Sequence, residues 1–248
     1  MDRALYIGMT GAKQAMRSQS VSSNNLANAN TPGFRKDFNN YIDSEIKGAG
    51  FNSRSNVIAN GRVSDFTPGQ MIHTDRDLDI AIKGKGFIAI QRADGTEGLT
   101  RVGSLKINEN GLLTNSEGLS VVGNDGGPIA IPPADKIQIG EDGTISIQPT
   151  GQTINNLAVV DKIKLVNPNI RDIEKSPDGT FGLVGADQSL SPDVNVKVVS
   201  GFVESSNVNG IEEMVKMISN ARLFEAQVKV MTTVKENDTA SSKLLRLS

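Results

Sequence analysis

The last forty residues of the chain, from Asn209 onward, contain no proline and only one glycine, Gly210. Their apolar side chains recur in alternating steps of three and four residues, the spacing of an amphipathic helix that packs along one seam. Asn209 can cap this helix, and Glu212 is placed to complete a capping box. The helix would be roughly 50 Å long, so it needs a partner along its whole length. The predicted seam consists of Met214, Met217, Ala221, Phe224, Val228, Met231 and Val234.

A second helix is predicted over residues 2–28. Its stripe also alternates steps of four and three, but most members are small or apolar and two in the second half are polar, so the stripe is narrow. Such a stripe suits one or two neighbouring helices better than a globular core. Its positions are Leu5, Met9, Ala12, Met16, Gln19, Ser23 and Leu26.

An asparagine-rich segment ends this helix. Four asparagines lie within residues 24–30, and Thr31-Pro32-Gly33 follows them. Proline pushes the residue before it out of the helical region, and asparagine side chains compete for backbone hydrogen bonds. Two interpretations stay open: a polar helix end with a turn, or a set of side-chain amides that bond to the backbone of a neighbour.

Residues 35–65 give a mixed signal. Tyr41, Ile42 and Ile46 could extend a short helix. The glycines and asparagines that follow, from Gly48 to Gly61, are typical of a loosely ordered linker. The sequence therefore predicts a helix extension and then a linker.

From about Phe66 to Val203 the apolar period changes to two, which indicates strands. Phe87-Ile88-Ala89-Ile90 is a predicted strand, and the turns Glu109-Asn110-Gly111 and Glu141-Asp142-Gly143 each lie between apolar alternations, as in hairpins. Further alternations are Ile163/Leu165, Phe181/Leu183 and Val194/Val196/Val198. No helical stretch interrupts the strands, so the sheet should be antiparallel.

The predicted fold is therefore α+β, with N- and C-terminal helices that form a coiled-coil-like stem and a central antiparallel β-domain. The predicted domains are an N-terminal helix, turn and linker (1–65), a β-domain (66–203) and a C-terminal helix (204–248). Each helix has an apolar stripe that one other helix would cover only in part. We expect the helices to pair with each other and with copies in other subunits, and to be frayed in the free monomer until assembly orders them.

Composition excludes several kinds of function. The chain has 248 residues, a net charge of −2 and no cysteine, so nothing indicates nucleic acid, disulfides or thiolate chemistry. Aromatic residues are only 4%, which disfavours a small-molecule pocket. We expect no membrane-spanning segment and no cleavable signal peptide, because Thr10, Lys13 and Gln14 break the first apolar stretch.

No catalytic, cofactor or metal site is predicted. Asp75, Asp77 and Asp79 alternate, but the glycine and glutamate of a calcium loop are missing, so we expect three carboxylates on one exposed face of a strand. His73 is the only histidine, and a lone histidine is rarely a metal site. No serine elbow or distinct carboxylate pair is found.

Several stretches, in order along the chain, resemble one family. Residues 23–34 resemble the N-terminal signature of the flagellar axial proteins, the rod and hook components of the bacterial flagellum. Residues 74–87 are similar to the segment that opens their β-domain, and Thr100-Arg101-Val102-Gly103-Ser104 to its continuation. Residues 204–209, with Met217-Ile218 and Phe224-Glu225, resemble the C-terminal helix of the family. The run Asn220–Glu225 is most similar to the proximal rod members; a distal rod or hook subunit is the alternative.

The resemblance implies a structural, non-enzymatic subunit of the flagellar basal-body rod. Such subunits pack their terminal helices into a hollow tube that crosses the periplasm and transmits torque, and they leave the cytoplasm through the flagellar export apparatus without a cleaved signal peptide. Implied partners are proximal and distal rod subunits, the export apparatus and peptidoglycan, but not nucleic acid. A cell-wall hydrolase is the alternative of another class. The implied assembly interface, with Asn24, Asn25, Asn28 and Asn30 locking neighbouring subunits, is Leu5, Met9, Met16, Asn24, Asn25, Leu26, Asn28, Asn30, Phe34, Asn207, Met214, Met217, Ala221, Phe224, Val228 and Met231.

Overall fold

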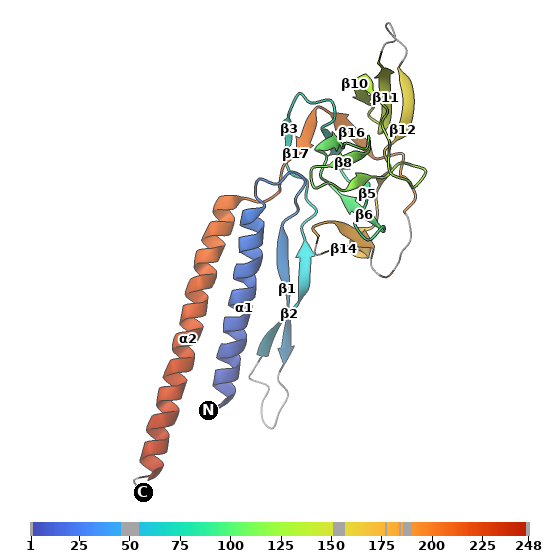
Figure 1. Ribbon diagram of the computed structural model, residues 1–248. Coiled ribbons are helices and arrows are strands. Elements are labelled where there is room, and N and C mark those ends of the chain that lie inside the picture. Colours follow the sequence, from blue (N-terminus) through green and yellow to red (C-terminus); the bar gives the residue numbers. More distant parts are fainter. Residues whose placement is uncertain are drawn as a thin grey trace. The chain divides into compact units, whose positions relative to one another are not determined.

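The computed structural model describes residues 2–45, 55–150, 157–176, 178–183, 185 and 190–246. The chain divides into two compact units. The first, here the helical unit, comprises Met1–Ala29, Lys36–Asp65 and Val208–Ser248; the second, the β-unit, comprises Asn30–Arg35 and Phe66–Asn207. The predicted α+β class is confirmed, with a helix near each end and an antiparallel β region between them (Figure 1).

The two long helices lie where the sequence predicts helices. Helix α1 comprises Asp2–Ala27, and α2 comprises Gly210–Arg246. The side chain of Asn209 caps α2, because its Oδ1 accepts hydrogen bonds from the backbone N–H groups of Ile211 (3.1 Å) and Glu212 (3.3 Å). The carboxylate of Glu212 forms an ion pair with Lys216 (2.6 Å).

Helices α1 and α2 run antiparallel and contact each other through small residues of α1. A Cβ added at Gly8 would lie 2.8 Å from Cγ of Met231, and one added at Gly11 would lie 2.9 Å from Cδ of Gln227. Glycine at both positions therefore lets the helix backbones approach closely. Helix α2 continues past the beginning of α1 (Figure 1), so α1 covers only part of its length.

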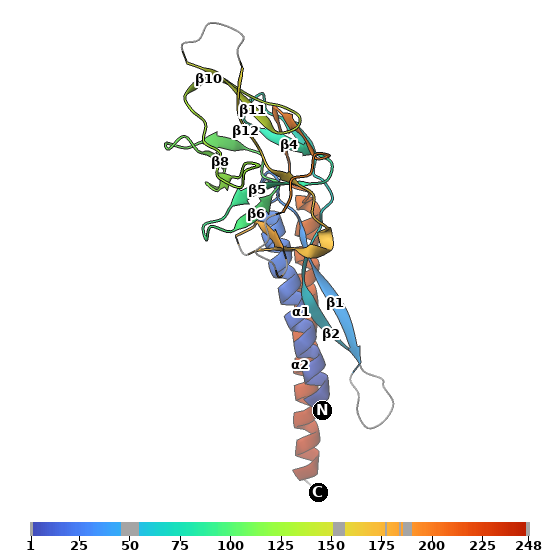
Figure 2. The same ribbon diagram turned by 90° about the vertical axis from the view of Figure 1, so that its right-hand side faces the viewer.

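Residues 36–65 differ from the prediction. They form an antiparallel hairpin of β1 (Asp37–Glu45) and β2 (Ser55–Ser64) rather than a helix extension and a linker. Ile46 and the glycines at 48 and 50 lie outside the described residues. Helix α1 lies between α2 and this hairpin (Figures 1 and 2). A two-stranded hairpin is marginal by itself, and its contacts with α1 stabilise it.

The β-unit consists of short antiparallel strands, as predicted. Seven strands form a path in the order β14-β15-β6-β5-β9-β8-β7, with β13 paired to β5; β10-β11-β12, β16-β4 and β17-β3 form smaller sheets. The strands are β3 Met71–His73, β4 Ile80–Lys83, β5 Phe87–Gln91, β6 Glu97–Thr100, β7 Leu105–Ile107, β8 Leu113–Asn115, β9 Ser120–Val121, β10 Ala134–Ile139, β11 Thr144–Pro149, β12 Ala158–Lys162, β13 Leu165–Val166, β14 Ile173–Lys175, β15 Phe181–Leu183, β16 Lys197–Ser200 and β17 Phe202–Glu204, with a 3-10 turn at Ile170–Asp172.

The core of the β-unit is aliphatic, with a smaller aromatic cluster. Branched side chains from many strands form the main core, among them Ile80, Ile88, Leu105, Leu113 and Ile145. In the second cluster the ring of Phe66 lies 6.0 Å from that of Phe87 and 5.3 Å from that of Phe181. Both turns predicted as hairpins are confirmed, since they join β7 to β8 and β10 to β11.

The three alternating aspartates do not share an exposed strand face, so that prediction is wrong. They lie in the loop before β4, where Asp75 has φ = 57°. Asp79 is buried; its Oδ1 lies 3.6 Å from a guanidinium nitrogen of Arg76 and accepts a hydrogen bond from the hydroxyl of Ser104 (3.2 Å). The conformation of the loop, and not the alternation of side chains along a strand, therefore determines where these three carboxylates lie.

Gly103→Ala is expected to destabilise the β-unit by about 1–3 kcal/mol or more, as overpacking does. A Cβ at this position would lie 1.7 Å from the carbonyl oxygen of Ile80, and backbone must move to relieve the clash. Gly127→Ala is the matched control, because its Cβ would meet nothing within 4 Å. Thermal unfolding of both variants measures the effect; equal melting temperatures would contradict the packing described here.

Candidate assembly surface

Helix α2 buries a seam that differs in part from the predicted one. The predicted residues Met217, Ala221, Phe224, Met231 and Val234 are half-buried, whereas Met214 and Val228 are exposed. In place of Met214 and Val228, the residues that precede them, Glu213 and Gln227, lie in the seam. The half-buried or buried positions follow a heptad, namely Glu213, Met217, Asn220, Phe224, Gln227, Met231 and Val234.

The packed stripe of α1 includes the predicted residues Leu5, Ala12, Gln19 and Leu26 but not Met9, Met16 and Ser23. Gly8, Ala12 and Ala15 are buried, whereas Met9 and Met16 are 52% and 58% exposed. Of the other predicted residues, Leu5 and Leu26 are half-buried. The prediction is wrong at Met9 and Met16, because close helix contact selects the smaller residues beside them, Gly8 and Ala15.

Both helices carry large apolar side chains on faces that their mutual contact leaves uncovered. On α2, Ile218 is 56% exposed, and its neighbours at positions 211 and 215 face solvent as well. A helix that is apolar on several sides is typical of one that is buried on several sides. The exposed large apolar residues are Tyr6, Ile7, Met9 and Met16 on α1, and Ile211, Met214, Val215, Ile218, Leu223, Val228 and Val230 on α2.

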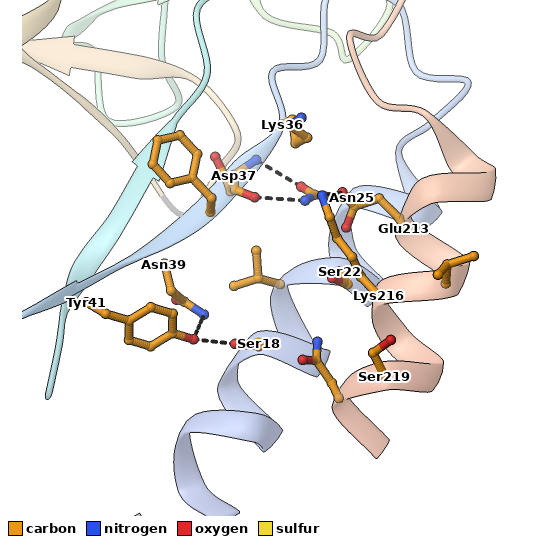
Figure 3. A pocket seen from close by; sticks show the side chains of 14 residues that line it. Ser18, Ser22, Asn25, Lys36, Asp37, Asn39, Tyr41, Glu213, Lys216 and Ser219 are labelled. Atoms are coloured by element: carbon orange, nitrogen blue, oxygen red, sulfur yellow. Dashed lines mark hydrogen bonds and ion pairs between the residues drawn. The ribbon is translucent and has the colours of Figure 1, made fainter. Parts of the chain in front are cut away.

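The asparagine-rich segment makes amide-to-backbone bonds within the chain itself. Asn25 is 1% exposed, its Nδ2 donates to the carbonyl oxygen of Asp37 (2.8 Å) and its Oδ1 accepts from the N–H of Asp37 (2.9 Å). Nδ2 of Asn28 donates to the carbonyl oxygen of Asn24 (3.0 Å). The two-way contact of Asn25 fastens the end of α1 to the start of β1 (Figure 3).

The remaining predicted interface residues belong to the β-unit: Asn30, Phe34 and Asn207. Nδ2 of Asn207 donates to the carbonyl oxygen of Thr67 (3.0 Å). Nζ of Lys175 lies 4.0 Å above the ring of Phe34. Asn207 and Phe34 are thus both anchored inside the β-unit, while Asn30 is exposed.

Asn25→Ala is expected to lower the free energy of unfolding of the helical unit by about 2–4 kcal/mol, since buried backbone groups at Asp37 lose an amide partner on both sides. Asn24→Ala removes the same side chain from an exposed position and should cost less than about 1 kcal/mol. Hydrogen exchange of the β1 amides reports the loss. Unchanged exchange in Asn25→Ala would show that this contact does not hold the hairpin.

A groove of about 310 Å³ lies beside this contact, between α1, β1 and α2 (Figure 3). Most of the residues that line it are of polar type, and the hydroxyls of Ser18 and Tyr41 share a hydrogen bond there. Nδ2 of Asn39 donates to the same Tyr41 hydroxyl (3.3 Å), and Nε2 of Gln14 donates to the carbonyl oxygen of Val57 (3.2 Å). One face of α1 therefore holds the hairpin by polar contacts, a role that the sequence analysis missed.

The charges at the groove are paired. Glu213 is buried and accepts a hydrogen bond from Nζ of Lys216 (3.0 Å). The hydrogen bond with Glu212, aided by Glu213, raises the pKa of Lys216 above its ordinary value, and Lys216 lowers the pKa of Glu212 in turn. Both pKa shifts favour the charged forms of Lys216 and Glu212, so this ion pair persists at neutral pH.

The carboxyl groups whose pKa shifts clearly, Asp94, Asp142 and Glu212, all shift downward, chiefly through hydrogen bonds from Thr96, Lys162 and Lys216 respectively. A general acid needs a raised pKa instead. Within the described part of the chain, no three potential metal ligands come together, and no helix is long and apolar enough to span a membrane.

Comparison with known proteins places this architecture in a family. Three family descriptions match in order along the chain: "Flagella basal body rod protein" over residues 5–35, "Flagellar hook protein FlgE/F/G D1 domain" over 81–147, and "Flagellar basal body rod FlgEFG protein C-terminal" over 199–244. The first match covers most of α1 and the turn after it, the second extends from β4 into β11, and the third covers β17 and most of α2.

Full-length relatives agree with these matches. The chain is 40% identical to the flagellar basal-body rod protein FlgF of Salmonella typhimurium and 40% identical to that of Escherichia coli, in both cases over 100% of each chain. It is 31% identical to the rod protein FlgG of Bacillus subtilis, over 95% of this chain and 96% of that one. The chain therefore belongs to the flagellar basal-body rod protein family, as one of its FlgF-like members.

Proposed function

We propose that this structural rod subunit polymerises through its helical unit, in which α1 and α2 form a coiled-coil-like stem, into the hollow shaft that transmits torque across the periplasm. The observation that carries the proposal is the set of large apolar side chains on the outer faces of both helices. Ile211, Ile218 and Leu223 on α2, and Tyr6 and Met16 on α1, remain exposed after the helices have packed together. Other subunits would bury them.

The relatives are named as basal-body rod proteins, so basal-body location and a non-enzymatic role follow from membership of the family. They give no support to a cell-wall hydrolase. A proximal position in the rod is our finer proposal, supported by higher identity to FlgF of Salmonella typhimurium and Escherichia coli than to FlgG of Bacillus subtilis. A distal position is the second candidate. Other rod subunits, the export apparatus and peptidoglycan are the partners that we propose.

The presence or absence of this chain in incomplete rods tests whether it is a proximal or a distal subunit. Basal bodies would be purified from strains that lack the distal rod subunit, with this chain as the replacement for the resident FlgF. A proximal subunit is retained in these particles, whereas a distal subunit is absent. Loss of the chain from every such particle would contradict the proximal assignment.

We further propose that the terminal helices open readily in the free monomer, which would suit export, and become ordered on assembly. The large seam residues of α2, Met217, Phe224 and Met231, stay only half-buried when the helices pack, which supports this. Amide hydrogen exchange at low concentration tests it. Fast exchange in α1 and α2 with protected core strands is expected; equal protection of both units would contradict it.

A further inference from the structure

The chain passes between its two units at four places, after residues 29, 35, 65 and 207. The β-unit therefore begins or ends a segment at Asn30, Arg35, Phe66 and Asn207. The last three of these lie within three positions of Arg35, Thr67 or Glu204. Residues 30–35, 66–69 and 204–207 are here called the connecting segments. Arg35 and Glu204 meet Arg101 in one buried ion cluster, here the Glu204 cluster, which belongs wholly to the β-unit. The carbonyl oxygen of Thr67 accepts a hydrogen bond from Arg35.

Glu204 holds both arginines with its single carboxylate. Oε1 lies 2.6 Å from an Nη atom of Arg35, and Oε2 lies 2.8 Å from an Nη atom of Arg101. The side chains of all three residues are almost completely buried. Oε1 also accepts a hydrogen bond from the N–H of Gly69 (2.8 Å), and the backbone carbonyl of Glu204 accepts one from the N–H of Gly33 (2.7 Å). One residue thus ties together segments that are far apart in the sequence.

The arginines extend this network to the rest of the β-unit. Arg35 donates to the carbonyl oxygen of Thr67 (2.8 Å), which also accepts from Asn207 (3.0 Å). Arg101 donates to the carbonyl oxygen of Gly84 (2.6 Å), and its guanidinium lies 5.5 Å from the centre of the Phe87 ring. The network therefore reaches from the chain connections to β5, the central strand of the core.

Close to the cluster, two glycines lie directly against the backbone of other segments. Gly33 has φ = 72°, and a Cβ there would lie 2.5 Å from the carbonyl carbon of Arg101. A Cβ at Gly69 would lie 2.0 Å from the carbonyl oxygen of Ser205. Glycine at both positions lets the connecting segments lie directly on the backbone of the β-unit.

A buried ion cluster adds little stability compared with well-packed apolar side chains of the same volume. Its hydrogen bonds are directional, however, and they fix each connecting segment in one geometry. We propose that the Glu204 cluster is the mechanical joint of the chain, which fastens the connecting segments to the β core so that torque from the helices reaches the core. This inference rests on the proposed role of the chain in a torque-transmitting shaft.

The test separates mechanical coupling from stability. The triple variant Arg35→Met, Glu204→Leu, Arg101→Met replaces the cluster by apolar side chains and should keep the melting temperature of the β-unit. Hydrogen exchange at the amides of Gly33 and Gly69 should become about 100-fold faster relative to the β5 amides, because the connecting segments now open locally. Asp142→Asn, which breaks an exposed pair with Lys162, is the control and should leave both amides unchanged.

Single-molecule pulling on the two ends of the full chain gives the second readout. Once the helices have opened, force acts on the β-unit at residues 30 and 207. The triple variant should rupture about tenfold faster than the native chain at equal force, which corresponds to the loss of one charge-assisted hydrogen bond. Unchanged exchange at Gly33 and Gly69, together with an unchanged rupture rate, would overturn the proposal.

If the triple variant does not fold, Arg35→Lys decides, because lysine keeps the charge and loses the two-pronged geometry of the guanidinium. Faster exchange at Gly33 with an intact core supports the joint, and unchanged exchange refutes it. These measurements use the purified chain, so they are independent of the rod. Failure of the native chain to enter rods would refute the proposed function alone.

Discussion

Glu204→Gln, which keeps the shape of the side chain and removes its charge, is expected to lower the free energy of unfolding of the β-unit by about 3–5 kcal/mol. The reason is that two buried guanidinium groups, those of Arg35 and Arg101, lose their counter-ion in a place that water does not reach. The opening free energy of the β5 amides, measured by hydrogen exchange, reports the change for this unit separately.

Glu212→Gln is the matched control for this variant. It removes the same charge from an ion pair with Lys216 in which both side chains are about half exposed, and solvent-exposed pairs contribute about 0–1 kcal/mol. A similar small loss in Glu204→Gln would show that water or rearranged side chains compensate for the missing charge.

The second large effect is expected for Ile218→Asp, which should abolish incorporation into rods while the monomer stays folded. Ile218 is exposed on α2 in the monomer, so the change costs little there. In the proposed assembly a carboxylate at this position is buried without a partner, which costs several kcal/mol at every subunit contact. Swimming and recovery of the chain in purified basal bodies measure the outcome.

Val194→Asp makes the same chemical change at an exposed position of the β-unit and should support normal swimming. Phe224→Asp and Met217→Asp should also block assembly, but these side chains lie in the seam between α1 and α2, so the variants should loosen the monomer as well. Normal rods with Ile218→Asp would refute burial of this face.

The sequence predicted the elements whose signal is local. Both long helices, the cap at Asn209 and the hairpin turns at Asn110-Gly111 and Asp142-Gly143 agree with the structure. In each case the signal is a short-range pattern of apolar spacing or turn residues, which can be recognised without knowledge of the tertiary contacts.

The helix faces could be predicted only in part. Apolar residues occur on several sides of α2, so a stripe through Met214 and Val228 fits the spacing as well as one through Glu213 and Gln227. The choice depends on α1, whose glycines at positions 8 and 11 accept Gln227 and Met231. A pattern read from one helix does not contain this information.

Long-range polar contacts account for the other differences. The hairpin β1–β2 has no regular apolar alternation, and polar side chains of α1, such as Gln14 and Ser18, contact it instead. Glu204 and Arg101 are 103 positions apart, so their pairing exists only in the folded chain. Periodicity identifies faces that bury apolar area, but it does not indicate which charges meet.

The most direct test of assembly through the helices uses the absence of cysteine from the native chain. A single cysteine would be introduced as Ile218→Cys, with Val194→Cys as the control, and its rate of reaction with a maleimide would be measured in the monomer and in purified basal bodies. We predict that the cysteine at position 218 reacts rapidly in the monomer and becomes protected in the rod, while the one at position 194 reacts in both. Equal reactivity at position 218 in monomer and rod would contradict assembly through this face of α2.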